Sequence, residues 1–373
     1  MPPSLSLRPL KNTQRLTLGA AIALTAVAGV VKAVGASPVT RFVVAGLALA
    51  ALAALVGQAI EQVGERLGPG PTALLQSTLG NLPELFVALF ALSDGLTDVV
   101  RAALVGSVLG NAVLVLGCVF VAGGLRHGPQ HFDPEEPRLN ASLLLLVVAA
   151  LLVPTLAVRL GTPAAPHISA LSNVCAVVLL IVYACSVPFY LRRRKSGEPG
   201  PALDPRPDRD AAPVDQSAPS AWPLSLSVVL LLVGSAGAAL ASDWFVGPLQ
   251  PAVRSLGLSQ TFTGLVVVAI ASNSVENAVG IRFALKAKPE YVISTTLNSP
   301  LQVALLLTPV LVLLSRVVGP TQLTLVFPPL LVAALAASAI VVAVIIYDGE
   351  YTWIEGVALI ALYIIIAASF WWG

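Results

Sequence analysis

The feature that most constrains this 373-residue chain is the recurrence of apolar stretches of about twenty residues with almost no charge. A helix that crosses a bilayer needs a stretch of that length, whereas membrane barrels use short alternating strands, a pattern that this sequence lacks. Only 11% of the residues are charged and 57% are apolar, which excludes an ordinary soluble domain and a disordered chain. The sequence therefore predicts an all-α, polytopic membrane protein.

Eleven transmembrane helices are predicted from these stretches. Their approximate ranges are 16–36, 39–65, 70–93, 97–123, 139–159, 168–191, 222–243, 261–285, 288–316, 323–347 and 351–372. The first range follows three basic residues, as a signal peptide does, but its apolar run is too long for one, so we interpret it as a span.

The distribution of basic residues predicts the orientation. With the N-terminus in the cytoplasm, fifteen of the 21 Lys and Arg residues fall on the cytoplasmic side and six fall outside. We expect a cell (inner) membrane protein with a cytoplasmic N-terminus and an external C-terminus. The net charge of +2 indicates no nucleic-acid partner, so the expected partners are inorganic cations and the lipid bilayer.

One long polar segment, rich in Pro and opening with four basic residues, divides the chain into two halves. Such a composition predicts a flexible cytoplasmic linker. The expected organisation is an N-terminal tail with the first helix, a first half with helices 2–6, the linker, and a second half with helices 7–11. The corresponding ranges are 1–38, 39–191, 192–221 and 222–373.

The two halves are related by an offset of 192 residues. This offset superposes four polar pairs: Asn81 on Asn273, Glu84 on Glu276, Asp98 on Glu290 and Ser107 on Ser299. Each half holds five predicted spans, an odd number, so the second half is expected to be inverted in the membrane. The expected fold is therefore two inverted five-helix repeats plus one extra N-terminal helix. Inverted repeats are typical of secondary transporters, whose substrate site lies between the repeats near mid-membrane.

Two acidic residues lie deep within predicted spans. Glu84 and Glu276 each stand about 14 residues from the start of their span. A charge at that depth costs about 2.5–3.5 kcal/mol on insertion scales and usually marks an ion or proton path. The alternative for each is a protonated glutamate that is hydrogen-bonded between two helices. A third acid, Glu61, is placed about one turn from a cytoplasmic helix end.

The neighbours of the two glutamates indicate the ligand chemistry. Gly80 and Pro83 predict a broken or kinked helix, which frees backbone carbonyls, and Asn81 and Asn273 add amide oxygens. Carboxylates with neutral oxygens suit a hard cation such as Ca²⁺, and the two clusters contain no Cys or His to bind Zn²⁺ or Cu⁺. The supporting polar residues in nearby spans are Ser107, Asn111, Asn277, Asn298, Ser299 and Gln302.

These segments resemble a known family. The segment Gly80–Leu85 together with Gly106–Asn111 is similar to the first α-repeat of the Ca²⁺/H⁺ exchangers, which belong to the Ca²⁺:cation antiporter superfamily. The segment Gly257–Gln302 is similar to the second α-repeat, and Asp348–Gly356 also resembles the family. The resemblance covers roughly residues 40–372. It implies eleven helices, a central cation site and exchange of Ca²⁺ for protons, with no cofactor apart from the transported ions.

The resemblance also implies roles for individual residues. By position, Glu84 and Glu276 match the two family glutamates that bind the cation and take up protons. The resemblance therefore implies that these two residues are the metal ligands. Asn81 and Asn273 match the asparagines beside them, and Glu61 matches a glutamate that implies a relay for protons or cations.

Some positions depart from the family pattern. Asn277 stands where the family usually has His, Ser272 and Asn298 each replace a usual Gly, and Pro83 is more similar to the Na⁺/Ca²⁺ exchanger branch. Na⁺/Ca²⁺ exchange and Na⁺/H⁺ exchange therefore stay open as alternatives to Ca²⁺/H⁺ exchange.

The paired glutamates by themselves predict antiport. Two carboxylates close together in a low-dielectric interior cannot both stay ionised when the site is empty, so a divalent cation and protons compete to neutralise them. A cation channel is the remote alternative, but it needs a continuous polar stripe and the sequence offers two separate clusters. An intramembrane enzyme is disfavoured because the sequence contains no HExxH or G-x-S-x-G motif.

Overall fold

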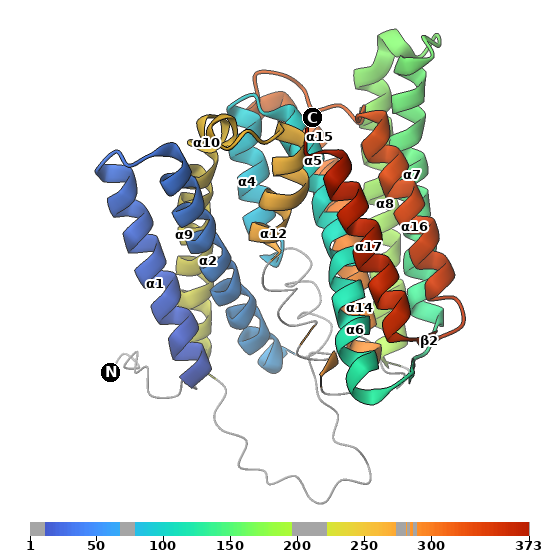
Figure 1. The fold of residues 1–373 in the computed structure, drawn as a ribbon, viewed down its shortest axis with the longest axis horizontal. Coiled ribbons are helices and arrows are strands. Elements are labelled where there is room, and N and C mark those ends of the chain that lie inside the picture. Colours follow the sequence, from blue (N-terminus) through green and yellow to red (C-terminus); the bar gives the residue numbers. More distant parts are fainter. Residues whose placement is uncertain are drawn as a thin grey trace, which may run out of the picture.

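The computed structural model describes residues 12–67, 79–195, 222–273, 281, 284–285 and 289–372. Apart from one two-stranded pairing, the elements are helices, some of them interrupted by short π-helical segments (Figure 1). The first half contains α1 (Asn12–Ala33), α2 (Pro38–Leu67), α4 (Leu82–Ser93), α5 (Thr97–Leu109), η1 (Gly110–Val115), α6 (Leu116–His127), β1 (Gln130–His131), α7 (Glu135–Arg159), η2 (Ala165–His167) and α8 (Ile168–Lys195). The second half contains α9 (Leu224–Val246), α10 (Leu249–Leu256), α11 (Gln260–Phe262), η3 (Thr263–Val268), α12 (Ala269–Ser272), α14 (Pro289–Gln302), η4 (Val303–Leu307), α15 (Thr308–Val318), α16 (Pro329–Ile345), β2 (Glu350–Tyr351) and α17 (Trp353–Ser369).

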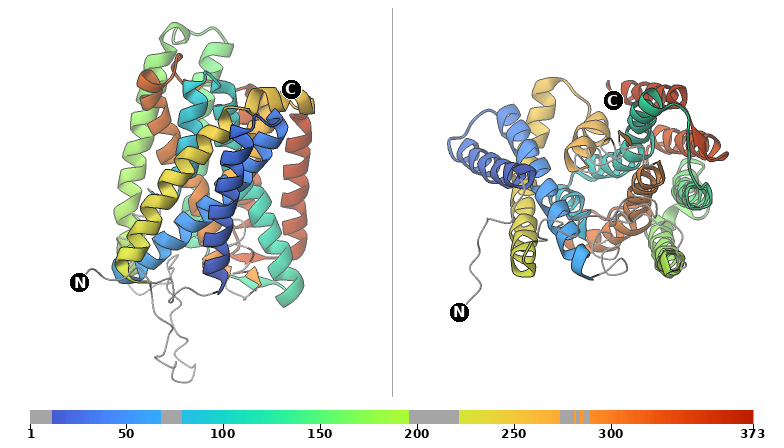
Figure 2. Two further views of the ribbon diagram at one scale, coloured as in Figure 1. Left: turned by 90° about the vertical axis from the view of Figure 1, so that its left-hand side faces the viewer. Right: turned by 90° about the horizontal axis from the view of Figure 1, so that it is seen from below.

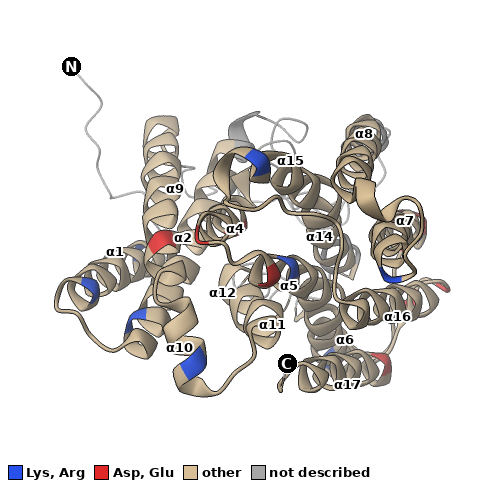
Figure 3. Cartoon of the chain, turned by 90° about the horizontal axis from the view of Figure 1, so that it is seen from above, with Lys and Arg blue, Asp and Glu red and all other residues tan. Residues whose placement is uncertain are grey.

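The helices form an upright bundle whose outer surface is apolar. Seven helices in the described ranges are long and apolar enough to cross a membrane, or eight if the bent pair α10 and 260–272 counts as one span. Large apolar side chains face outward, for example Leu16 at 72% exposure and Ile181 at 56%. Charged residues are few and scattered when the bundle is seen from above (Figure 3). An apolar exterior around satisfied helical backbones is the arrangement that a bilayer requires, so the chain is a multi-pass membrane protein.

Three helices stand together at one side of the bundle. α2 packs along α9, and α1 packs along α2 (Figures 1 and 2). Part of their contact is a separate apolar cluster, which contains Val56, Ile60, Trp222 and Leu226. The main core is formed by the remaining helices together with buried residues of α1, α2 and α9, and α5 packs against η3 within it.

Glycines allow the central helices to touch backbone to backbone. A Cβ added at Gly106 of α5 would lie 2.1 Å from the carbonyl oxygen of Leu265 in η3, and one at Gly264 would lie 2.6 Å from the carbonyl oxygen of Val99. Small residues permit such close helix approach in membranes. Gly110, by contrast, has nothing within 4 Å of an added Cβ, so only the first glycine of the Gly106/Gly110 pair acts as a packing residue.

Three sequence expectations need correction or refinement. The range 323–347 is not one helix, because α16 begins only at Pro329 after an extended segment that Pro328 and Pro329 keep out of the helical conformation. The short helix α10 was not expected, and it makes a bend of 117° with residues 260–272. α8 continues to Lys195, four residues into the expected linker, whose residues 196–221 lie outside the described ranges.

Candidate functional site

Two asparagines stand at helix termini inside the bundle, one at the start of a helix and one at the end of another. Asn81 caps the N-terminus of α4 with φ −91° and ψ 16°, and Asn273 caps the C-terminus of α12 with φ −98° and ψ 15°. Both residues therefore leave the helical conformation in nearly the same way, in the sparsely populated bridge region that active-site residues often occupy. The start of α4 at Leu82 agrees with the helix break that Gly80 and Pro83 predict.

Glu84 lies in the first turn of α4 and is only 7% exposed. The N-terminal end of a helix favours a negative charge, so this position suits an ionised carboxylate. Glu84 lines a cavity of about 20 Å³ whose other polar walls are Ser107 and Ser272. A cavity needs about 10–15 Å³ to hold a water molecule, so this one has room for a single water or one bare cation.

Asn273 joins the two halves through a buried hydrogen-bond network. Its Oδ1 accepts hydrogen bonds from Ser107 Oγ at 3.2 Å and from Asn111 Nδ2 at 2.9 Å, while its own Nδ2 donates to Ser107 Oγ at 2.9 Å. Asn111 Nδ2 also donates to Ser299 Oγ at 3.0 Å. These four residues come from α5, η1, α14 and the C-terminal cap of α12, so the network joins helices of both halves beside the cavity.

Asn81 makes a separate contact with the second half. Its Nδ2 donates to Gln302 Oε1 at 3.1 Å. Among the predicted site residues, the structure thus places Asn81, Glu84, Ser107, Asn111, Asn273, Ser299 and Gln302 on the helices around one buried region.

Asn298 belongs to a different network from its neighbour Ser299. Asn140 Nδ2 of α7 donates to Asn298 Oδ1 at 2.9 Å, and Asn298 Nδ2 donates to Glu136 Oε1 at 3.3 Å. Sequence reasoning missed Asn140 and Glu136, since Glu136 precedes the expected span 139–159 although α7 already begins at Glu135. The available signal was Asn140 itself, an amide at the start of an otherwise apolar span, which is only 2% exposed.

Three predicted site residues cannot be placed. Glu276 and Asn277 lie outside the described residues, and Glu61 lies in α2 but its side chain is likewise outside the description. Within the described ranges, no group of three or more His, Cys, Asp or Glu side chains is arranged to hold a metal ion.

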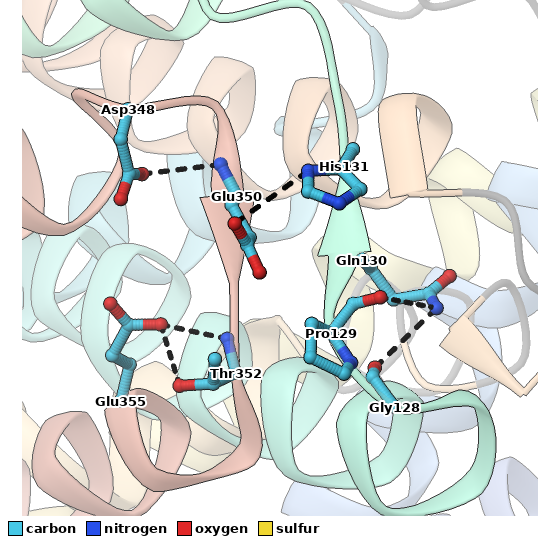
Figure 4. A network of polar contacts seen from close by, with 8 residues as sticks. All are labelled: Gly128, Pro129, Gln130, His131, Asp348, Glu350, Thr352 and Glu355. Carbon is cyan, nitrogen blue, oxygen red and sulfur yellow. Dashed lines mark hydrogen bonds and ion pairs between the residues drawn. The ribbon is translucent and has the colours of Figure 1, made fainter.

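The segment Asp348–Gly356 lies beside residues 128–131 in a network of polar contacts (Figure 4). β1 pairs antiparallel with β2, and His131 Nδ1 lies 3.7 Å from Glu350 Oε2. Gly349 has a φ of 80°, which favours glycine, and Glu355 caps α17 by accepting a hydrogen bond from Thr352 N at 2.7 Å. These contacts fix the turn between α16 and α17 and the start of α17.

Comparison with known proteins identifies the family. The model of the family described as sodium/calcium exchanger protein matches residues 37–191 and 226–372. A Ca²⁺/H⁺ antiporter of Synechocystis sp. is 37% identical over 89% of this chain and 90% of its own length, and the Ca²⁺/H⁺ antiporter ChaA of Bacillus subtilis is 32% identical over 88% and 91%.

The fold also matches a solved structure of a relative. Native YfkE has a TM-score of 0.78 and 29% identity, over 95% of this chain and 99% of its own. The H⁺/Ca²⁺ exchanger CAX, with a TM-score of 0.69 and 18% identity over 96% and 92%, shares the fold. The resemblance inferred from the sequence is confirmed: the chain belongs to the sodium/calcium exchanger protein family of membrane antiporters.

Proposed function

We propose that this protein is a secondary antiporter that exchanges Ca²⁺ for H⁺ by alternating access. The observation that carries the proposal is Glu84, a carboxylate buried in a cavity of one-cation size, in a chain whose relatives are named Ca²⁺/H⁺ antiporters. Those relatives are transporters by name, which supports transport over catalysis.

The chemistry at the site follows from charge neutralisation. A carboxylate in this apolar surrounding is stable when it binds either a proton or a cation, so the two ions compete for one place. We propose Glu276 as the second carboxylate, with Asn81 and the nearby hydroxyls as neutral oxygen ligands of a hard cation. Glu61 is proposed as a relay, and Asn277 as a neutral neighbour of Glu276.

The element order supports two inverted repeats. Shifted by 192 residues, α5 corresponds to 289–301 and α6 to 308–319, close to the bounds of α14 and α15. The π-helical segment η1 shifts to 302–307, where η4 lies. In Figure 1 the chain descends from α5 to α6 and ascends from α14 to α15. The family model also matches two blocks, which supports halves at 39–191 and 222–373.

The proposed topology has eleven crossings. This number counts the seven long helices, the bent pair and three shorter apolar helices. The shorter helices are Leu82–Ser93, Pro329–Ile345 and Trp353–Ser369. α1 begins at the lower end of the bundle and α17 ends at the upper end, as an odd number requires (Figure 1). With the basic-residue bias, the lower end is the cytoplasmic side.

Uptake into proteoliposomes tests the proposed function. Vesicles with an acidic interior, no Na⁺ and a clamped voltage receive external ⁴⁵Ca²⁺. Uptake that a protonophore abolishes supports Ca²⁺/H⁺ exchange. Uptake that begins only when internal Na⁺ is supplied would support the Na⁺/Ca²⁺ alternative, which Pro83 and Asn277 favour by their departure from the proton-coupled pattern.

A further inference from the structure

We infer that the two equivalent asparagines have different roles. Asn273 is a positioning residue whose amide is fully hydrogen-bonded within the protein, while Asn81 supplies an amide oxygen to the transported cation. The inference rests on the proposed function and names the neutral ligand within that site. Sequence symmetry alone predicts the same role for both residues, because an offset of 192 superposes them and their backbone angles agree.

The Asn273 amide has no oxygen lone pair left for a cation. An amide oxygen offers two lone pairs, and Ser107 Oγ and Asn111 Nδ2 both donate to this one. Its Nδ2 donates to the carbonyl oxygen of Ala269 at 2.9 Å. Since a carbonyl oxygen can only accept, that contact fixes which end of the amide is nitrogen. Asn273 is also only 3% exposed, so it is held on every side.

The Asn81 amide is held by a single contact. Its Nδ2 donates to Gln302 Oε1, and among the described residues its Oδ1 receives no hydrogen bond. If both amides were turned over, Gln302 would donate to Asn81 Oδ1 instead, which still leaves one lone pair. In either orientation Asn81 keeps an oxygen that can bind a cation, close in sequence to Glu84 on the first turn of α4.

The asymmetry has an identifiable origin in the sequence. The residues that engage Asn273 include Asn111 and Ser272, and Ser272 Oγ lies 3.3 Å from Asn273 Nδ2. Their counterparts at the 192-residue offset are Val303 and Gly80, which have no side-chain donor or acceptor. Asn273 therefore has two polar neighbours, one from each half, whose equivalents for Asn81 carry no polar side chain.

Alanine substitutions separate the two roles. Asn81→Ala removes a cation ligand, so the Ca²⁺ concentration for half-maximal uptake is expected to rise about tenfold. The melting temperature in Ca²⁺-free detergent is expected to fall less than in Asn273→Ala, because Asn81 makes one hydrogen bond. Asn273→Ala leaves Ser107 and Asn111 without their buried partner, so the melting temperature and the maximal rate fall. The Ca²⁺ concentration for half-maximal uptake is then expected to change by less than about twofold, because no cation ligand is removed.

Two further variants keep the test decisive if Asn273→Ala fails to fold. Asn111→Val introduces the residue type found at its counterpart, Val303, and removes one hydrogen bond to Asn273. It is expected to lower the melting temperature and the maximal rate, but less than Asn273→Ala does. Asn81→Asp keeps the oxygen and adds charge, so Ca²⁺ binding is retained or tightened. Asn273→Asp instead faces the carbonyl oxygen of Ala269 with an anionic oxygen and is expected to lower the melting temperature.

The experiment measures Ca²⁺ uptake and the Ca²⁺-dependent rise in melting temperature for the wild type and these variants. A rise in half-saturating Ca²⁺ for Asn81→Ala alone supports the inference. Equal rises for Asn81→Ala and Asn273→Ala would overturn it while leaving the proposed function in place. A wild-type protein that neither transports Ca²⁺ nor gains thermal stability from it would overturn the proposed function, and this inference with it.

Discussion

Substituting Gly106 with alanine tests whether the close contact of α5 with η3 positions the site. A Cβ at Gly106 would lie 2.1 Å from the Leu265 carbonyl oxygen, whereas ordinary contact begins at 3.4 Å. The two backbones must therefore separate by about 1.3 Å, the difference between these distances. Ser107 follows Gly106 directly, so its 2.9 Å hydrogen bond with Asn273 Nδ2 is expected to open.

The expected cost combines two effects. Overpacking of a tight core costs about 1–3 kcal/mol, and a buried polar group left without its partner costs about 1–3 kcal/mol. Gly106→Ala should therefore destabilise the protein by about 2–6 kcal/mol. A misplacement of about 1 Å at a reacting site can cost about a hundredfold in rate, so transport should fall much further than protein yield.

Gly110→Ala is the matched control because it lies one turn away and has open space around an added Cβ. Replacing glycine by alanine in a helix there should be neutral or stabilise by about 0.5–1 kcal/mol. Thermal unfolding in detergent, followed by tryptophan fluorescence, and Ca²⁺ uptake are measured for both variants. Melting temperatures and rates for Gly106→Ala that equal those of Gly110→Ala would refute the reasoning.

Three other predictions concern charge, topology and coupling. Glu84→Gln and Glu276→Gln should each abolish exchange without lowering the melting temperature, because glutamine keeps the volume but cannot titrate, and a variant retaining more than about half of the wild-type rate would contradict their role. Reporter fusions at Ser196 and Gly373 should report opposite sides of the membrane, whereas the same side for both would exclude eleven crossings. Asn277→His should shift the pH dependence of uptake, since it adds a group that titrates near neutral pH, and an unchanged pH profile would mean that this position does not take part in proton coupling.

Much of the architecture was predictable because hydropathy and helix length are properties of the local sequence. The expected range 97–123 corresponds to the continuous run of α5, η1 and α6. Gly80 and Pro83 predicted the helix break at which α4 begins. The family membership was predictable as well, since its motifs surround Glu84. The extended segment before Pro329 was missed because its residues are as apolar as those of a membrane helix, and hydropathy alone does not distinguish extended from helical backbone.

The arrangement around the site was less predictable, because it depends on contacts between distant segments. Symmetry in the sequence treats Asn81 and Asn273 alike, and only the packing of α5 and η1 against the end of α12 distinguishes them. The contact of Asn298 with Glu136 also joins residues 162 positions apart, which no local pattern reports.

Proton flux measured together with Ca²⁺ flux tests the central claim most directly. Vesicles containing a pH-sensitive dye at neutral internal pH and no Na⁺ receive external Ca²⁺ under clamped voltage. We predict that Ca²⁺ entry makes the interior more alkaline, because each entering cation displaces protons from the carboxylate site, and that Glu84→Gln abolishes both fluxes together. Ca²⁺ entry without any change in internal pH, or unchanged fluxes in Glu84→Gln, would contradict the account.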